Sequence, residues 1–310
     1  MFYVLNLGSR STIVVGLEKI NGKCQLMDVF KIDATYSDFI NNTVPEQLMQ
    51  SITDFASHRY FVVCDAFYKC GTATVDEIMT NTTGDLDELK IANVCDDLLP
   101  IGLKKNEYVG TIMRRFPKTE RQDFVSTAYI KKELSEGIER YFAEAGAELF
   151  GIYSETFVFT ELLAALDYTE YILKIRTGKF VYCSPKGIVV CQNTAYSDED
   201  AVSFLYSFEN DLFETAADTQ LQLPAVLLAN KLDTICNANI SGRYIPDLEQ
   251  YKKEIYASLG ACAAWRGKPH GRKPGPSGET STGYTDALQK EDGKYGLFEK
   301  IRQFFAQARH

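Results

Sequence analysis

The chain has 310 residues, of which 45% are apolar and 12% aromatic, so it can bury one large core or two ordinary ones, and wholesale disorder is excluded. Its formal net charge of −9 comes from 33 basic and 42 acidic residues, which disfavours nucleic acid as a partner. No apolar stretch approaches the roughly 20 residues that span a bilayer, and the N-terminus lacks the basic region of a signal peptide, so we expect a cytoplasmic protein.

The opening segment predicts three strands, a helix and a fourth, buried strand. Asn21-Gly22, between the second and third strands, is a strong hairpin signal. In chain order the five predicted elements cover residues 2–7, 12–17, 24–32, 45–58 and 60–66. This β-β-β-α-β order is the start of an RNase-H-like unit.

The middle of the chain predicts a compact α/β insert, and the part after it repeats the opening pattern in weaker form. The insert has a short helix over 86–98, strands over 107–114 and 122–128, and a helix over 130–145 that ends at Gly146. The elements predicted after it are an extended segment over 151–157, helices over 161–166, 198–217 and 246–264, and strands over 171–176, 180–183, 188–192 and 225–228.

These patterns divide the chain into two similar α/β halves, an insert and a tail. Residues 266–285 are rich in Gly, Pro, Ser, Thr and basic residues, which cannot bury enough apolar area to offset the entropy of ordering. The predicted parts are the start of the first half (1–60), the insert (61–145), the first half resumed (146–166), the second half (167–265), a flexible linker (266–290) and a C-terminal helix (291–310).

The eight cysteines are scattered without a CxxC pair, and the chain has only three histidines. Neither a zinc cluster nor a disulfide framework is indicated, so we expect no metal site. Reduced thiols in the core are the better interpretation, because free cysteine is among the most buried residue types.

The turn between the first two strands, Leu5 to Thr12, resembles the D-x-G-x-x-x-[ST] phosphate turn of the sugar kinase, heat-shock 70 and actin superfamily. In that turn backbone N–H groups hold phosphate and the Asp orients magnesium-bound water. Asn6 stands in the place of that Asp, and a neutral amide is a weak ligand for a hard dication. The other turn residues to which the resemblance assigns a place in the nucleotide site are Gly8, Ser9, Arg10, Ser11 and Thr12.

Two further turns depart from the superfamily pattern. Lys174 and Arg176 occupy the places of a second D-x-G, and Asn230 and Lys231 lie in the stretch that replaces the adenosine-side Gly-Gly. No acidic magnesium partner is left at these turns, so we expect a vestigial nucleotide site, no catalytic residue and no ATP hydrolysis. ATP with Mg²⁺ stays open as a bound cofactor, because the three cations can meet phosphate charge; the alternative is that they are surface side chains.

The region from Asp87 to Leu166 is similar to the matching region of the PilM family of type IV pilus assembly proteins. The matching pieces are a helix at 86–89, Leu99-Pro100-Ile101, extended segments at 106–108 and 124–129, and the stretch 144–148 around Gly146. FtsA and the cytoplasmic domain of GspL place their insert at the same point. The resemblance implies an actin-like fold of two RNase-H-like halves with a small α/β insert in the first.

A PilM-like protein implies a scaffold on the inner face of the cell membrane, within a type IV pilus or related secretion assembly. Its partner would be the cytoplasmic N-terminal peptide of a bitopic inner-membrane protein of the PilN type. The resemblance implies a groove for that peptide between the first half and the insert, lined by parts of Tyr60–Ala66 and Glu107–Ala128. An FtsA-like ATP-binding filament protein tethered to the membrane, and a small-molecule kinase, are the alternatives.

The last segment predicts a basic amphipathic helix. Lys300 and Arg302 lie beside an apolar face formed by Leu297, Phe298, Ile301, Phe304 and Phe305. Such a helix behind a flexible linker is typical of an anchor on anionic lipid, and it resembles the C-terminal membrane-targeting helix of FtsA. Docking on a partner protein, or folding back onto the body, is the alternative.

Overall fold

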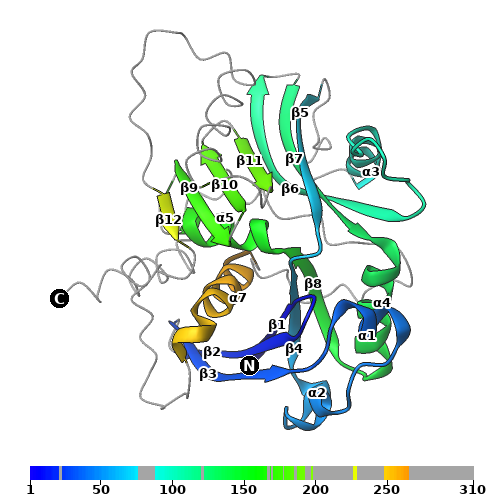
Figure 1. Cartoon of the computed structure of the whole chain (residues 1–310), viewed down its shortest axis with the longest axis vertical. Helices are drawn as coiled ribbons and strands as arrows, with labels where there is room; N and C mark the ends of the chain where they lie inside the picture. The colour runs from blue at the N-terminus through cyan, green and yellow to red at the C-terminus, as the bar shows by residue number, and fades with distance from the viewer. Residues whose placement is uncertain are drawn as a thin grey trace, which may run out of the picture.

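The computed structural model describes residues 1–20, 23–75, 88–119, 122–165, 168, 170–176, 178–184, 187–192, 197, 226–228 and 248–264. These residues form two mixed sheets, a third small sheet and the helices around them (Figure 1). Several predicted features lie outside the described residues, namely the Asn21-Gly22 turn, the helix over 198–217, Asn230, Lys231, the linker and the C-terminal helix.

The first sheet has five strands in the order β3-β2-β1-β4-β8. β2 is antiparallel to both β1 and β3, whereas β4 is parallel to both β1 and β8. The bounds are β1 Phe2–Leu7, β2 Thr12–Ile20, β3 Lys23–Ile32, β4 Arg59–Cys64 and β8 Glu148–Ser154. The four strands predicted at the start of the chain are confirmed, and the strands flanking Asn21-Gly22 pair as a hairpin requires.

Alternate residues of the central strands face two separate cores. Val4, Phe61 and Val63 pack in one core with α5 (Glu155–Ala165) and α7 (Lys252–Ala264). The second core, on the other face, holds Leu5 and Val62 with α1 (Tyr36–Asn41) and α4 (Lys132–Glu144). Because both faces are covered, β4 is an unbroken apolar run, as is usual for a buried parallel strand.

The helix predicted over 45–58 is wrong. The structure has a four-residue helix α2 (Gln47–Gln50) and a separate 3₁₀ turn at Phe55–Ser57. Asp54 between them takes the left-handed conformation with φ 53°, which a continuing helix does not allow. Leu48 and Phe55 are nevertheless buried, so the pattern found the buried positions and missed the break.

The second sheet repeats the strand order of the first. Its order is β11-β10-β9-β12, with β9, β10 and β11 antiparallel in sequence and β12 parallel to β9. The bounds are β9 Tyr171–Arg176, β10 Lys179–Ser184, β11 Gly187–Gln192 and β12 Val226–Leu228. Two halves with the same mixed topology confirm the predicted actin-like α/β fold.

The insert is a three-stranded antiparallel sheet in the order β5-β7-β6 with one helix beside it. Its elements are β5 Tyr68–Val75, α3 Glu88–Asp97, β6 Tyr108–Thr119 and β7 Gln122–Lys131. β5 was not predicted. The predicted limits of 61 and 145 also need correction, because β4 pairs with β1, and α4 packs against α1 of the first half.

α7 begins after a short 3₁₀ turn at Leu248–Tyr251 and returns to the first half. It crosses α5 and lies along β1 and β2 (Figure 1). Gly260 stands at the crossing, where a Cβ would collide with the carbonyl oxygen of Val158. This close approach brings the first turns of α7 beside the turn between β1 and β2. No described helix has an apolar stretch long enough to cross a bilayer.

Candidate functional site

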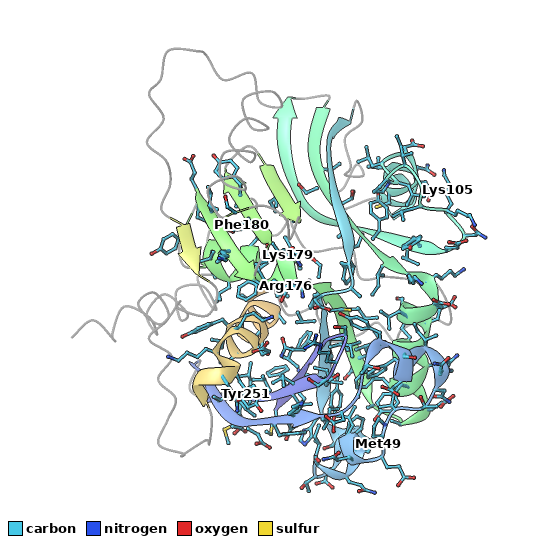
Figure 2. The ribbon with its side chains drawn as sticks, in the orientation of Figure 1. Met49, Lys105, Arg176, Lys179, Phe180 and Tyr251 are labelled. Carbon is cyan, nitrogen blue, oxygen red and sulfur yellow. The ribbon has the colours of Figure 1, made fainter. Side chains whose placement is uncertain are left out.

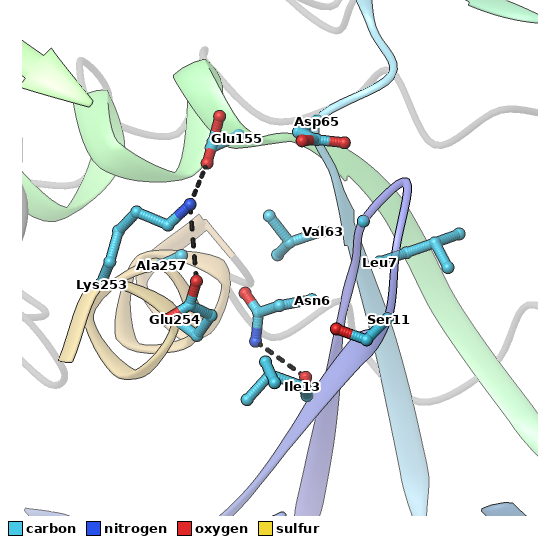
Figure 3. A pocket seen from close by; sticks show the side chains of 11 residues that line it. Asn6, Leu7, Ser11, Ile13, Val63, Asp65, Glu155, Lys253, Glu254 and Ala257 are labelled. Atoms are coloured by element: carbon cyan, nitrogen blue, oxygen red, sulfur yellow. Dashed lines mark hydrogen bonds and ion pairs between the residues drawn. The ribbon is translucent and has the colours of Figure 1, made fainter. Parts of the chain in front are cut away.

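A pocket of about 120 Å³ lies against the turn between β1 and β2 (Figure 3). Its walls come from that turn, the end of β4, the first residue of α5 and the first turns of α7. Sites for drug-sized ligands commonly enclose about 300–1,000 Å³. The pocket sits where the sequence predicts a phosphate turn, but it is small for a nucleotide.

Asn6 is held by two hydrogen bonds that an aspartate could not make. Its Nδ2 donates to the carbonyl oxygen of Ile13 at 3.3 Å and to the hydroxyl of Ser258 at 3.0 Å. The Ser258 hydroxyl in turn donates to the carbonyl oxygen of Glu254 at 2.7 Å, which leaves its oxygen free to accept. The amide therefore ties β1 to β2 and to α7.

The rest of the predicted phosphate turn is divided between pocket, core and surface. Gly8 and Ser11 line the pocket, and the Gly8 N–H donates to the Ser11 carbonyl at 3.2 Å. Thr12 is fully buried, and its hydroxyl donates to the Ala34 carbonyl at 2.8 Å. Ser9 and Arg10 are exposed and do not line the pocket. The expected role of Thr12 toward phosphate is therefore not supported, because its hydroxyl is engaged in the core.

Three carboxylates that sequence reasoning missed line the same pocket. They are Asp65, directly after β4, Glu155, which opens α5 directly after β8, and Glu254 in the first turn of α7. One signal was available for Glu155. Ser154-Glu155 has the pattern of a helix start, and the Ser154 hydroxyl accepts the Phe157 N–H at 3.0 Å as an N-cap.

Glu155 is buried with two cations as partners. Its Oε2 accepts from Lys179 Nζ at 3.0 Å and its Oε1 from Lys253 Nζ at 3.0 Å. The residue is 4% exposed, and burial on its own would raise its pKa. The charges of Lys179 and Lys253, with a smaller contribution from Arg176, outweigh that effect and lower the pKa of Glu155 to about 2. Glu155 is therefore ionised at neutral pH.

Two of the predicted phosphate cations lie within the described residues, and they make different contacts. They are Arg176 and Lys174. Arg176, at the end of β9, donates from Nη1 to Oδ2 of Asp65 and lies near Lys179 in the middle of the molecule (Figure 2). Lys174 lies with its ammonium 5.6 Å from the ring centre of Phe180, in the second half. Arg176 therefore reaches the end of β4 in the first half, where Asp65 matches its charge.

The charges around the pocket are balanced by internal pairing. Lys253 also contacts Glu254 at 3.4 Å, and Figure 3 shows its ammonium between Glu155 and Glu254. Asp65, Glu155 and Glu254 thus face Arg176, Lys179 and Lys253, and every one of these six side chains takes part in an ion pair. Among the residues that the structure describes, no group of three or more His, Cys, Asp or Glu side chains is arranged to hold a metal ion.

The cysteines that the structure describes with their side chains are buried free thiols, as the sequence predicts for this group. They are Cys64, Cys95, Cys183 and Cys262. Burial raises the pKa of Cys64 and of Cys95 to about 12, so both thiols are protonated at neutral pH. All four side chains belong to the hydrophobic cores.

No family model matches the sequence, and no curated protein is significantly similar to it. Several solved structures share the fold. One is the cytoplasmic domain of EpsL, an inner-membrane component of the type II secretion system of Vibrio cholerae, at 12% identity and a TM-score of 0.41, covering 83% of this chain and 94% of that one. Another is the PilM-PilN type IV pilus biogenesis complex, at 14% identity and a TM-score of 0.48, covering 83% and 96%.

A third similar structure is a Ppx/GppA family member from Aquifex aeolicus, at 10% identity and a TM-score of 0.33, covering 84% of this chain and 88% of that one. Since the identities are low and the TM-scores lie below 0.5, nothing about activity or partners follows from them. The fold of this chain rests on its own strand order.

Proposed function

We propose that the protein is a cytoplasmic scaffold of a type IV pilus or related secretion assembly, peripheral to the inner membrane, in which the nucleotide cleft has become structural. The observation that carries the structural role of the cleft is the set of ion pairs around the pocket. Phosphate binding needs free cations and N–H groups, and magnesium needs free carboxylates. Arg176 and Lys253 are paired with Asp65 and Glu155, and Asn6 is bonded to α7.

The class of partner is taken from the sequence resemblance to the PilM family, a cytoplasmic peptide of a bitopic inner-membrane protein. Part of the expected groove needs correction. Tyr60–Cys64 form β4 in the middle of the first sheet and are buried, so they cannot line an open groove. We place the peptide instead at the junction of the insert and the first half, against Asp65–Phe67 and Tyr108–Thr111.

Two observations support that junction as the peptide site. Residues 65–67 and 108–111 are all partly exposed. Ala66, Phe67 and Val109 pack against the same core cluster, so the two segments share one apolar surface. A partly exposed apolar surface between two sheets suits a short peptide with apolar anchors better than it suits a polar small molecule.

The test uses fluorescence anisotropy with a panel of synthetic peptides, each with the cytoplasmic N-terminal sequence of a short bitopic inner-membrane protein from the same genome. We expect saturable binding that Mg-ATP does not change. Val109→Asp should weaken it by about tenfold or more, since a charge would enter the apolar contact. Met49→Asp is the matched control, because Met49 is 38% exposed on α2, and it should change the affinity little.

Absence of binding to the unmodified chain would overturn the proposed partner, and binding only in the presence of ATP would overturn the structural role of the cleft. Equal weakening by both substitutions would place the peptide elsewhere. Circular dichroism of the two variants separates loss of binding from loss of folding. The predicted anchor role of the C-terminal helix remains a proposal, because that helix lies outside the described residues.

A further inference from the structure

Two ion pairs connect the first half of the chain to the second sheet, and a third pair holds one of the carboxylates from α7. Asp65, which follows β4 of the first sheet, accepts from Arg176, which ends β9 of the second sheet. Glu155, the first residue of α5, accepts from Lys179 at the start of β10 and from Lys253 in the first turn of α7. The paired residues are 111, 24 and 98 positions apart, so these are tertiary contacts.

These ion pairs are largely shielded from solvent, so pulling the two partners of a pair apart costs free energy. The side chains of Glu155 and Lys179 are 5% and 6% exposed, and those of Asp65 and Arg176 are 21% and 34% exposed. Inside a protein the attraction between opposite charges is stronger than in water, and a buried charge that loses its partner is strongly unfavourable. Moving the halves apart would leave Glu155 or Lys179 as a buried charge without the partner that it has in the other half.

The packing of α7 against α5 brings the first turn of α7 to the ion pairs of Glu155. α7 crosses α5 at Gly260 and lies along the first sheet, and its N-terminal turn carries Lys253 to Glu155. Asn6 bonds the same helix through Ser258. The N-terminal turns of α7 are therefore attached to the first half at two points beside the same small pocket.

We propose that the pair of Asp65 with Arg176 and the pair of Glu155 with Lys179 form an interdomain latch that fixes the orientation of the two halves without any bound ligand, with Lys253 of α7 holding Glu155 in place. The latch lies beside the pocket, where the ends of β4 and β8 meet the ends of β9 and β10, and the attraction between its opposite charges holds the two halves together. It rests on the proposed function in one respect, namely that no nucleotide connects the halves. A scaffold with such a latch presents the insert and the first half in one fixed arrangement to its partner.

The test is hydrogen exchange of the full chain measured by mass spectrometry in the absence of nucleotide. Arg176→Gln removes the charge that Asp65 requires, and we expect exchange at residues 171–184, at the start of α5 and at the first turns of α7 to rise about tenfold. β6 and β7 of the insert should not change. Lys105→Gln is the control, because Lys105 pairs with Asp96 at 3.4 Å on the exposed surface of the insert.

Swapping the two charges of the Asp65–Arg176 pair tests whether their attraction holds the halves together or whether the two side chains merely pack there. The double variant Asp65→Arg with Arg176→Asp restores opposite charges across the cleft, so it should recover most of the protection lost in Arg176→Gln. If Arg176→Gln does not fold, Asp65→Asn tests the same pair from the first half with a milder change. Exchange that stays unchanged, or a rise that spreads equally over the insert, would overturn the latch, as would a double variant that recovers nothing.

The outcome is independent of the proposed partner. If Arg176→Gln opens both sides of the cleft and the peptide does not bind the unmodified chain, the latch stands and the proposed function fails. If the peptide binds and the exchange pattern does not change, the scaffold stands and the latch fails.

Discussion

Glu155→Gln is expected to lower the free energy of unfolding by about 3–5 kcal/mol, the range measured when one partner of a buried ion pair is removed. The substitution keeps the size of the side chain but leaves Lys179, whose side chain is 6% exposed, without the carboxylate of Glu155, and Lys253 keeps only its contact with Glu254. Urea denaturation followed by circular dichroism measures the change, provided that the slope with denaturant stays the same.

The matched control for this prediction is Glu136→Gln in α4. Glu136 contacts Lys132 at 3.8 Å on the surface, and its side chain is 60% exposed. An exposed pair of this kind contributes little, so the control should unfold at nearly the urea concentration of the unmodified chain. A loss at Glu155 as small as that at Glu136 would contradict the account of the cleft.

Asn6→Asp is expected to destabilise the chain by about 1–3 kcal/mol, although it restores the residue that an active phosphate turn carries. The carboxylate would face the carbonyl oxygen of Ile13 and the oxygen of Ser258, both of which now accept from the amide. Acceptors that oppose one another in a partly buried site cannot be satisfied without rearrangement. Urea denaturation at neutral pH measures this change too.

The double variant with Ser258→Ala identifies the cause. Removing the Ser258 hydroxyl removes one of the two acceptors, so Asn6→Asp should cost less in that background than in the unmodified chain. An Asn6→Asp variant as stable as the unmodified chain would show that the amide is not required by its neighbours. Equal losses in both backgrounds would show that the bond to α7 contributes nothing.

The strands could be predicted from the sequence because their signals are local. Asn21-Gly22 marks one hairpin, and the apolar run Tyr60–Cys64 marks the central parallel strand. The sequence predicts an extended segment at the start of α5 and a helix only from Glu161, whereas α5 begins at Glu155. Nearly all of Glu155–Ala165 is buried, so the helix has no polar face from which a helical period can be read.

The site could be predicted only in part, for a related reason. The sequence identifies Asn6 because a turn is defined by a few adjacent residues, and Arg176 because it ends a recognisable strand. Asp65, Glu155 and Lys253 were missed, because their roles depend on which residues lie opposite them. The pairing of Glu155 with Lys253 spans 98 positions, and it exists only once α7 has crossed α5. No local pattern reports such a contact.

Titration of the purified full chain with ATP and magnesium in a calorimeter tests the structural role of the cleft most directly. With Arg176 and Lys253 paired to Asp65 and Glu155, and a pocket of about 120 Å³ beside the turn, we expect no heat of binding up to millimolar nucleotide. A related protein with a known ATP site, titrated in the same buffer, serves as the positive control. Micromolar, magnesium-dependent binding would contradict the account.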